Sequence, residues 1–418
     1  MNKAFQLMNS RNFQPAIEIL EELFDDNDGN VKLRNTLATA YNNYATQLRM
    51  QKNTESFTYF EKALKLSPSQ AAVRFNYASG LYDMGKYEDA IYQLEYSYSK
   101  ITGRNRQQAD MLLGLSYFKI NDYSRSGYYF DEVDPSKTPA VYFYKGFIKY
   151  KLGKISEAIS IWKEFSSRYP GQASKFQVSN WLKKALTENI VEKEFSRDTT
   201  SHFMVNCDVD DKKIDLNFIL TAFEEAYYDV GRDLEIYPKN RIPVVIYSSH
   251  KQYRTATNSP EWTGGLWDGT KIRIPASICK SGKEILEHTI FHEYVHLLFS
   301  TKYEKQYRSI PIWLNEGCAE YFSHVLLEKP IKPLKLTNNA KNSLNAFFSN
   351  PAYFKSAKTA RSAYRIALHS VRFIVDQYGN KLLLKLINNM ANRNPRPFYE
   401  SLNCSQSDFI DAFIEYLK

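Results

Sequence analysis

A short pattern repeats through the first half of the chain and leaves few folds open to it. A turn residue is followed two positions later by an aromatic residue or isoleucine, and three positions after that by a small residue. The small residues of three copies are Ala90, Ser126 and Ala158, so the steps are 36 and 32 residues. Internal periods of this length are typical of solenoids built from stacked, similar units.

The pattern predicts pairs of antiparallel helices. The small residue lets the second helix of a pair approach the first, and Gly85, Asn121 and Gly153 suit a turn with unusual backbone dihedrals. Larger side chains are expected to fill the gaps between helices: Tyr77, Leu81, Leu94, Tyr117, Phe130, Phe147 and Trp162. We therefore expect about five such pairs, ending near residue 190.

This stretch resembles the tetratricopeptide-repeat family, whose period is about 34 residues. The resemblance implies an α-helical solenoid with a concave surface that binds a peptide or a partner protein. A spacer, or a packing platform for the second domain, is the alternative reading of the same repeats.

The sequence changes character after about residue 195. Residues 202–207 alternate as in a strand, residues 213–236 read as an amphipathic helix, and residues 241–247 read as a second strand. Residues Trp262 to Pro275 resemble a hairpin with Asp268-Gly269 at the turn. Because the chain then becomes mostly helical, these strands followed by helices predict an α+β domain.

The segment Phe291-His292-Glu293-Tyr294-Val295-His296 contains the pattern HExxH inside an apolar-periodic helix that begins near Lys283. Positions i and i+4 of a helix share one face, so the two imidazoles can reach one metal ion. Glu293 can then lie beside a water molecule and act as a general base, which is the arrangement of a zinc peptidase.

A third zinc ligand is expected from the segment around Trp313-Leu314-Asn315-Glu316-Gly317, because zinc takes three protein ligands in catalytic sites. Glu316 and Glu320 are again spaced i and i+4. One of them can bind zinc while the other accepts a hydrogen bond from a ligand histidine and so fixes its tautomer.

HExxH followed by an NEGxA-type helix resembles the gluzincins, and residues 200–418 resemble the peptidase MA-like domain that is often fused to tetratricopeptide repeats in bacteria. The resemblance implies that His292, His296 and Glu316 bind one Zn²⁺, that Glu293 is the general base and that Glu320 supports a ligand histidine.

Gluzincins often use a later Tyr or His to stabilise the oxyanion. This implies a catalytic role for Tyr364, with His369 in reserve and packing as the alternative for Tyr364. His324, beyond the Glu316 segment, is expected at the surface.

Gly264 and Gly265 suit an edge strand that another backbone approaches closely. They are therefore candidate substrate-binding residues that pair with an extended peptide. The alternative is that they only bend the hairpin. Cys318 is expected to be a small buried residue.

Composition limits the partners. The 55 Lys and Arg residues outnumber the 46 Asp and Glu residues, for a net charge of +9, but they form no tight run, so no nucleic-acid partner is expected. The four cysteines suggest no disulfide framework. No apolar stretch is long enough to predict a transmembrane segment. The start of the sequence has no signal-peptide core, which indicates a cytoplasmic protein; an exported or periplasmic protein whose signal was removed is the alternative.

Together these features predict a tetratricopeptide-like solenoid over residues 1–192, followed by a zincin-like (gluzincin) α+β domain over residues 198–418. Within the latter we expect a strand-rich part (198–278), the two ligand helices (282–328) and a helical C-terminal part (335–418). The predicted function is zinc-dependent hydrolysis of peptide bonds, with the repeats docking a substrate or partner. A non-catalytic interaction scaffold with an inactive zincin-like module is the alternative.

Overall fold

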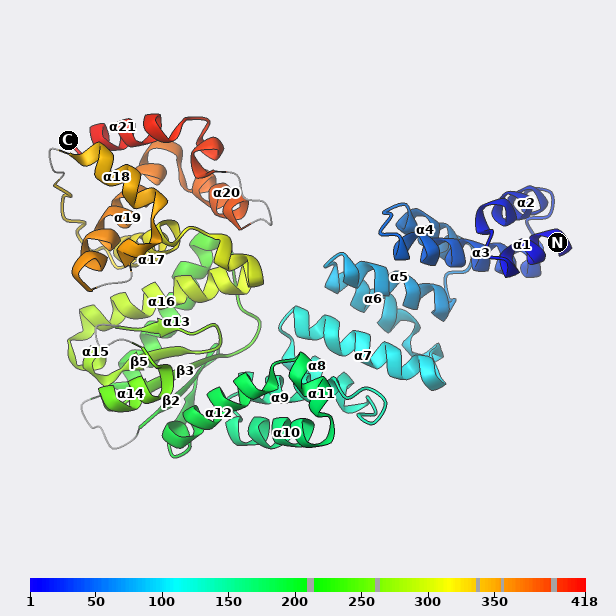
Figure 1. Ribbon diagram of the computed structural model, residues 1–418, viewed down its shortest axis with the longest axis horizontal. Helices are drawn as coiled ribbons and strands as arrows, with labels where there is room; N and C mark the ends of the chain where they lie inside the picture. Colours follow the sequence, from blue (N-terminus) through cyan, green and yellow to red (C-terminus); the bar gives the residue numbers. More distant parts are fainter. Residues whose placement is uncertain (209–213, 260–263, 336–338, 355–356, 392–396) are drawn as a thin grey trace. The chain divides into compact units, whose positions relative to one another are not determined.

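A computed structural model describes the chain except for residues 209–213, 260–263, 336–338, 355–356 and 392–396 (Figure 1). The chain forms two compact units. The first comprises Met1–Tyr150 and Glu157–Leu182, and the second comprises Lys151–Ser156 and Lys183–Lys418.

The first unit is built from consecutive helices, and from α1 to α8 each helix packs on the next one along the chain (Figure 1). The helices of the repeat region are α1 (Asn2–Asn9), α2 (Phe13–Asp25), α3 (Val31–Met50), α4 (Ser56–Leu66), α5 (Ala71–Asp83), α6 (Tyr87–Ser97), α7 (Gly103–Lys119), α8 (Tyr123–Asp131), α9 (Val141–Lys151), α10 (Ile155–Arg168), α11 (Pro170–Lys175) and α12 (Val178–Glu192).

The turns between paired helices have the backbone that the sequence pattern requires. Gly85, Asn121 and Gly153 have φ values of 78°, 58° and 71°, in the left-handed region that glycine and asparagine tolerate. The small residues Ala90 and Ser126 are fully buried at the contact between helices. The predicted helical solenoid is therefore confirmed, and its turns lie where the repeat pattern places them.

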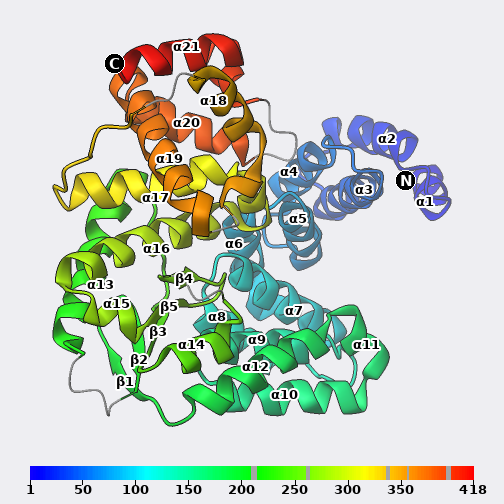
Figure 2. The same cartoon turned by 60° about the vertical axis from the view of Figure 1, so that its left-hand side comes forward.

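The described residues of the second unit form a five-stranded mixed sheet in the order β1-β2-β3-β5-β4 (Figure 2). β2, β3 and β5 are parallel to one another, while β1 and β4 are antiparallel edge strands. The strands are β1 (Ser196–Thr199), β2 (Phe203–Cys207), β3 (Ile242–Tyr247), β4 (Leu266–Trp267) and β5 (Ile272–Pro275).

The hairpin β4–β5 forms with Leu266 opposite Arg273 and turns at Asp268-Gly269, where Gly269 has a φ of 84°. This confirms the predicted hairpin from Leu266 onward; its predicted first residue, Trp262, lies outside the described residues. The same holds for residue 213 at the start of the predicted amphipathic helix, which is observed over Leu216–Leu234.

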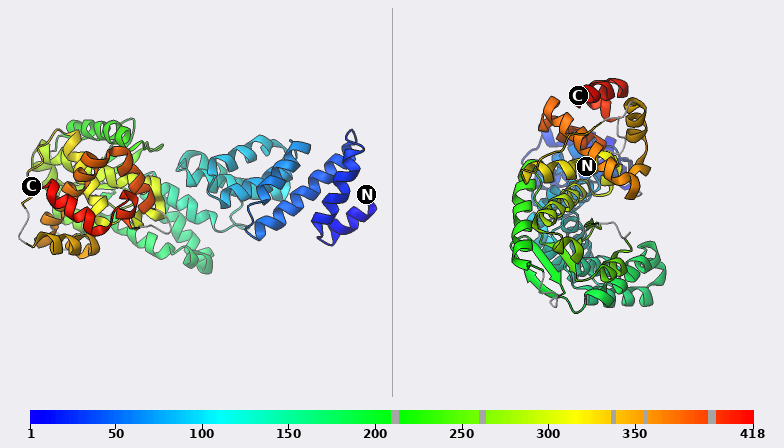
Figure 3. Two further views of the ribbon diagram at one scale, coloured as in Figure 1. Left: turned by 90° about the horizontal axis from the view of Figure 1, so that it is seen from above. Right: turned by 90° about the vertical axis from the view of Figure 1, so that its left-hand side faces the viewer.

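Helices cover the sheet and form the rest of the second unit. They are α13 (Leu216–Leu234), α14 (His250–Thr257), α15 (Ala276–Lys280), α16 (Lys283–Tyr303), α17 (Ile312–Leu326), α18 (Ala340–Ser349), α19 (Ala357–Tyr378), α20 (Asn380–Met390) and α21 (Gln406–Tyr416). In Figure 3 the yellow helix α17 and the orange to red helices α18 to α21 lie together in one part of the second unit. An α+β domain with a helical C-terminal part is therefore present, as predicted. None of the helices among the described residues is long and apolar enough to span a bilayer.

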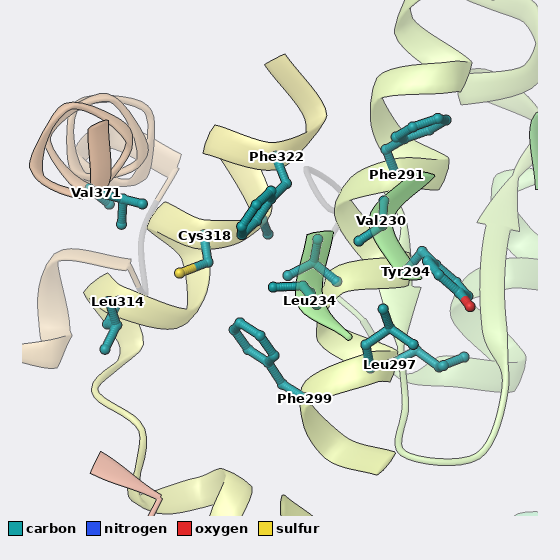
Figure 4. Close-up of a cluster of buried hydrophobic side chains, with 14 of the residues drawn as sticks. Val230, Leu234, Phe291, Tyr294, Leu297, Phe299, Leu314, Cys318, Phe322 and Val371 are labelled. Atoms are coloured by element: carbon teal, nitrogen blue, oxygen red, sulfur yellow. The ribbon is translucent and has the colours of Figure 1, made fainter. Parts of the chain in front are cut away.

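α16 is buried on most of its surface because the sheet, α13 and α17 all pack against it. Figure 4 shows side chains of α13, α16, α17 and α19 meeting in one apolar cluster. Its labelled members are Val230, Leu234, Phe291, Tyr294, Leu297, Phe299, Leu314, Cys318, Phe322 and Val371. Cys318 is fully buried here, as expected.

Gly317 brings α17 and α19 unusually close together. A Cβ atom at this position would lie 2.6 Å from the main-chain oxygen of Ala367 and 2.8 Å from Cγ2 of Val371. Only glycine therefore allows this approach, because a main-chain oxygen cannot rotate away. The contact positions Tyr364, one turn earlier on α19, beside the Glu316 end of α17.

A buried ion cluster fastens α12 to the hairpin. Arg273 binds Glu192 and Glu188 of α12 at 2.6 Å each and Asp268 at 2.7 Å, and Lys271 binds Glu188 at 2.7 Å. Besides Lys151–Ser156, the second unit includes α12 from Lys183 onward, whereas the sequence predicts that the second domain starts at residue 198. Charged residues on a short strand gave no sign that their partners precede the sheet in the sequence.

Candidate metal centre

Two helices present matching rows of ligand-type side chains. On α16, His288, His292 and His296 follow one another at i, i+4 and i+8, so they share one face. On α17, Glu316, Glu320 and His324 have the same spacing. The two rows face each other and form two groups of three possible metal ligands, one of them His292, His296 and Glu316.

The first group converges on a single point. The Nε2 atoms of His292 and His296 are 3.1 Å apart, and Oε2 of Glu316 is 3.3 Å from each of them. Bonds of about 2.0–2.1 Å to a tetrahedral zinc ion would separate its N and O ligands by about 3.3 Å. The spacing, ligand types and slight exposure of the three side chains (10–15%) therefore fit zinc.

Glu316 gives a second reason to place a cation there. Its Oε2 atom is buried and makes no well-aligned hydrogen bond, although buried polar atoms normally have a partner. A metal ion held between this oxygen and the two imidazole nitrogens would supply that partner.

The other ring nitrogen of each histidine is held in place. Nδ1 of His292 lies 3.1 Å from Oε1 of Glu320, and Nδ1 of His296 lies 3.1 Å from Oδ1 of Asn315. Asn315 in turn donates from Nδ2 to the hydroxyl of Tyr307, 2.8 Å away. These contacts favour the tautomer in which Nε2 is the free ligand atom of both rings.

The charges of this group perturb one another strongly. Burial would raise the pKa of Glu316, but the positive charge of His296 and the contact with His292 outweigh it and hold the pKa at about 2. Burial lowers the pKa of His292, but Glu316 and Glu320 more than reverse this and raise it well above its ordinary value. A histidine whose pKa is raised keeps its second ring proton to higher pH, so a metal ion that binds these nitrogens would have to displace that proton.

Glu293 lies on the neighbouring face of α16 and is buried, which raises its pKa. The N–H of Trp267 on the edge strand β4 donates to Oε2 of Glu293 at 2.6 Å. Gly265, just before β4, approaches so closely that a Cβ atom would lie 2.8 Å from Cγ and 2.9 Å from Oε1 of Glu293. Among the described residues, a Cβ on Gly264 would meet only Ile278, at 3.5 Å.

Tyr364 stands next to the histidines, with its ring centroid 6.1 Å from that of His292. Burial and the nearby carboxylates of Glu316 and Glu293 raise the pKa of its hydroxyl, which therefore stays protonated. His369, the reserve candidate, is also buried on α19, but its Nε2 contacts the main-chain oxygen of Lys332 at 3.0 Å.

The structure thus brings together His292, Glu293, His296, Glu316, Glu320, Tyr364 and Gly265, while Gly264 lies one residue further from the carboxylate. Asn315, Trp267 and His288 were missed as site residues. Asn315 carried a weak signal because it directly precedes Glu316, whereas the donor of Trp267 is a main-chain group that no side-chain pattern reveals. His324, expected at the surface, instead faces His288, with its side chain 20% exposed.

Comparison with known families agrees with this geometry. Residues 222–396 match the Peptidase MA superfamily model. The segment contains α16, α17 and α19, which carry the histidines, the carboxylates and Tyr364. Residues 140–171, which include all of α9 and α10, match the tetratricopeptide-repeat model. A peptidase-like MA domain preceded by tetratricopeptide repeats is confirmed in that order.

No curated protein sequence matches the chain. Among solved structures, that of MamA is 17% identical, covers 42% of this chain and 98% of MamA, and has a TM-score of 0.32. The structure of PilF from Pseudomonas aeruginosa is 16% identical, covers 46% of this chain and 90% of PilF, and has a TM-score of 0.30.

Proposed function

We propose that the MA-like domain is a zinc-dependent metallopeptidase that hydrolyses peptide bonds. The observation that supports this most directly is the convergence of His292 Nε2, His296 Nε2 and Glu316 Oε2 at 3.1–3.3 Å from one another. A zinc ion held by these atoms would act as a Lewis acid on a peptide carbonyl and lower the pKa of a water molecule to about 7.

Glu293 is the general base of this proposal. The N–H of Trp267 holds Oε2, so the carboxylate is fixed and Oε1 accepts the proton from the attacking water. The raised pKa of Glu293 brings its carboxylate nearer to the range in which one group can both take up and give back a proton at neutral pH. Glu293 then donates this proton to the nitrogen of the leaving amine.

Tyr364 donates a hydrogen bond to the oxyanion of the tetrahedral intermediate. Its raised pKa keeps the proton on the hydroxyl, which is the form that can donate. A single donor of this kind contributes about 10²–10³ in kcat in other acyl-transfer enzymes.

The edge strand β4 offers a place for an extended peptide. β4 pairs only with β5 among the described strands, so one side of it is open to a further strand. The N–H of Trp267 is already used by Glu293, so the substrate backbone would pair with the main chain at Gly264 and Gly265. The repeats would dock the rest of a protein substrate, or a partner protein.

Metal content tests the proposal. Mass spectrometry of purified protein should find zinc in the wild type and much less in Glu316→Ala, while His250→Ala, a histidine of α14 outside the ligand rows, should retain it. Zinc-loaded wild type should also cleave peptides in a substrate screen. A wild type that binds no zinc after incubation with the metal would refute the proposed peptidase activity and favour the non-catalytic interaction scaffold.

A further inference from the structure

A second group of metal-ligand type lies beside the first. We propose that His288, Glu320 and His324 form a second divalent-cation site, one helical turn away from the His292 site. The three residues continue the two facing rows of α16 and α17, and each offers a ligand atom within reach of the other two.

The distances describe a looser version of the first site. Nε2 of His288 is 3.2 Å from Nδ1 of His324, and Oε2 of Glu320 is 3.5 Å and 3.8 Å from these two nitrogens. The corresponding distances in the first group are 3.1 Å and 3.3 Å. Small side-chain rotations must close the second group around an ion, so it binds more weakly than the first.

Two existing hydrogen-bond contacts would change when an ion binds. Nδ1 of His324 lies 2.8 Å from the main-chain oxygen of Glu320, and Nε2 of His288 lies 3.1 Å from Oγ of Ser323. Ligation through Nδ1 moves the ring proton of His324 to Nε2. Ser323 Oγ keeps its contacts with the main-chain oxygens of Ala319 and Glu320, so it is not left without a partner.

The donor set selects the kind of ion. Two imidazoles and one carboxylate suit Zn²⁺, Co²⁺ or Ni²⁺, whereas Ca²⁺ and Mg²⁺ prefer oxygen ligands. The side chains are 17–23% exposed, compared with 10–15% in the first group. An ion can therefore reach the second group from solvent, and water can complete its coordination.

Glu320 links the two groups. Its Oε1 atom contacts Nδ1 of His292 at 3.1 Å, while Oε2 faces His288 and His324. A cation on Oε2 draws negative charge away from Oε1 and so weakens the support that Glu320 gives to His292. Binding at the two sites is therefore negatively coupled: an ion at either site lowers the affinity of the other site for its ion, by the same factor in both directions.

Metal stoichiometry tests the second site without any assay of activity. Apo-protein is titrated with Co²⁺, with free ion measured by equilibrium dialysis and tetrahedral sites followed by visible absorption. We expect two ions in the wild type, one tight and one weaker. His324→Ala and His288→Ala should each keep only the tight ion, Glu316→Ala should keep only the weaker one, and His250→Ala should keep both.

Two results would overturn the second site. One is saturation of the wild type at a single ion; the other is a second ion that survives both His288→Ala and His324→Ala. Circular dichroism establishes that each variant is folded, and the two single-histidine variants give independent readings if one of them is not. Loss of the tight ion alone would count against the proposed zinc peptidase and leave the second site standing.

Discussion

Replacing Gly265 by alanine should damage catalysis while leaving the metal in place. The added Cβ would lie 2.8 Å from Cγ and 2.9 Å from Oε1 of Glu293, and 2.8 Å from Cγ2 of Thr289. Ordinary carbon–carbon contacts are about 3.5–4.0 Å, so the Glu293 side chain must shift by roughly 0.7 Å or more. The general base is therefore displaced without the loss of any side chain.

The size of the effect follows from this shift. A misplacement of about 1 Å at a reacting group costs about 100-fold in rate, so we expect kcat to fall about 10- to 100-fold. Crowding of a packed site should also cost about 1–3 kcal/mol of unfolding free energy. Zinc content should not change, because Glu293 is not among the three converging ligand atoms.

Gly264→Ala is the matched control. Among the described residues its Cβ would meet only Ile278, with Cδ1 at 3.5 Å and Cγ1 at 3.9 Å, both ordinary contact distances. Neither glycine has a left-handed backbone that an alanine would strain. Alanine at position 264 keeps the main-chain groups that would pair with a substrate peptide, so we expect kcat within about twofold of wild type and a stability change within about 0.5 kcal/mol. The assay is the initial rate of peptide hydrolysis at equal zinc content, with guanidinium unfolding in parallel. Wild-type kcat in Gly265→Ala, or equal losses in both variants, would refute the reasoning.

Four further outcomes follow from the same contacts. Asn315→Ala removes the acceptor at His296 Nδ1 and should weaken zinc binding about 10- to 100-fold in a chelator competition; unchanged affinity would contradict the orienting role. Tyr364→Phe should lower kcat about 10²–10³-fold at unchanged zinc content, whereas a purely packing tyrosine would leave kcat intact. Arg273→Met removes one of the two cations that pair with the buried Glu188 and Glu192 and should cost about 3–5 kcal/mol in urea unfolding; a cost below about 1 kcal/mol would show that Lys271 alone compensates their charge. Burial would raise the pKa of Glu192, but Lys271 and Arg273 hold it below its ordinary value. The ionised Glu192 therefore stabilises the fold fully above pH about 4.3, and this contribution disappears as the pH falls through the lower pKa of the folded state. An unfolding free energy that does not decline on the acid side would contradict the pairing of Glu192 with these cations.

The sequence predicted the parts of the site that depend on spacing within one helix. His292 and His296 share a face because they are four residues apart, and α16 begins at Lys283 as expected. Glu316 was identified through a resemblance and a downstream helix, and the structure places its carboxylate against both imidazoles. The repeat turns were equally predictable, since each needs a residue that accepts a left-handed backbone.

The parts that depend on how separate elements meet were not predictable. The register between α16 and α17 decides that His288 faces His324, and no local pattern encodes that register. The contact of Trp267 N–H with Glu293 depends on the position of β4 at the edge of the sheet, and the pairing of α12 with Arg273 depends on burial of charges far apart in sequence. Gly265 was noticed as an edge-strand residue, but its approach to Glu293 is visible only in three dimensions.

The most direct test of the central claim compares zinc-loaded wild type with Glu293→Gln on one peptide substrate at equal, measured zinc content. Glutamine keeps the shape of the side chain and an acceptor for the N–H of Trp267, but it cannot take a proton from water. We expect release of new amino termini by the wild type and a loss of at least about 100-fold in the cleavage rate of Glu293→Gln. Equal cleavage by both proteins, or none by a wild type that carries its zinc, would contradict it.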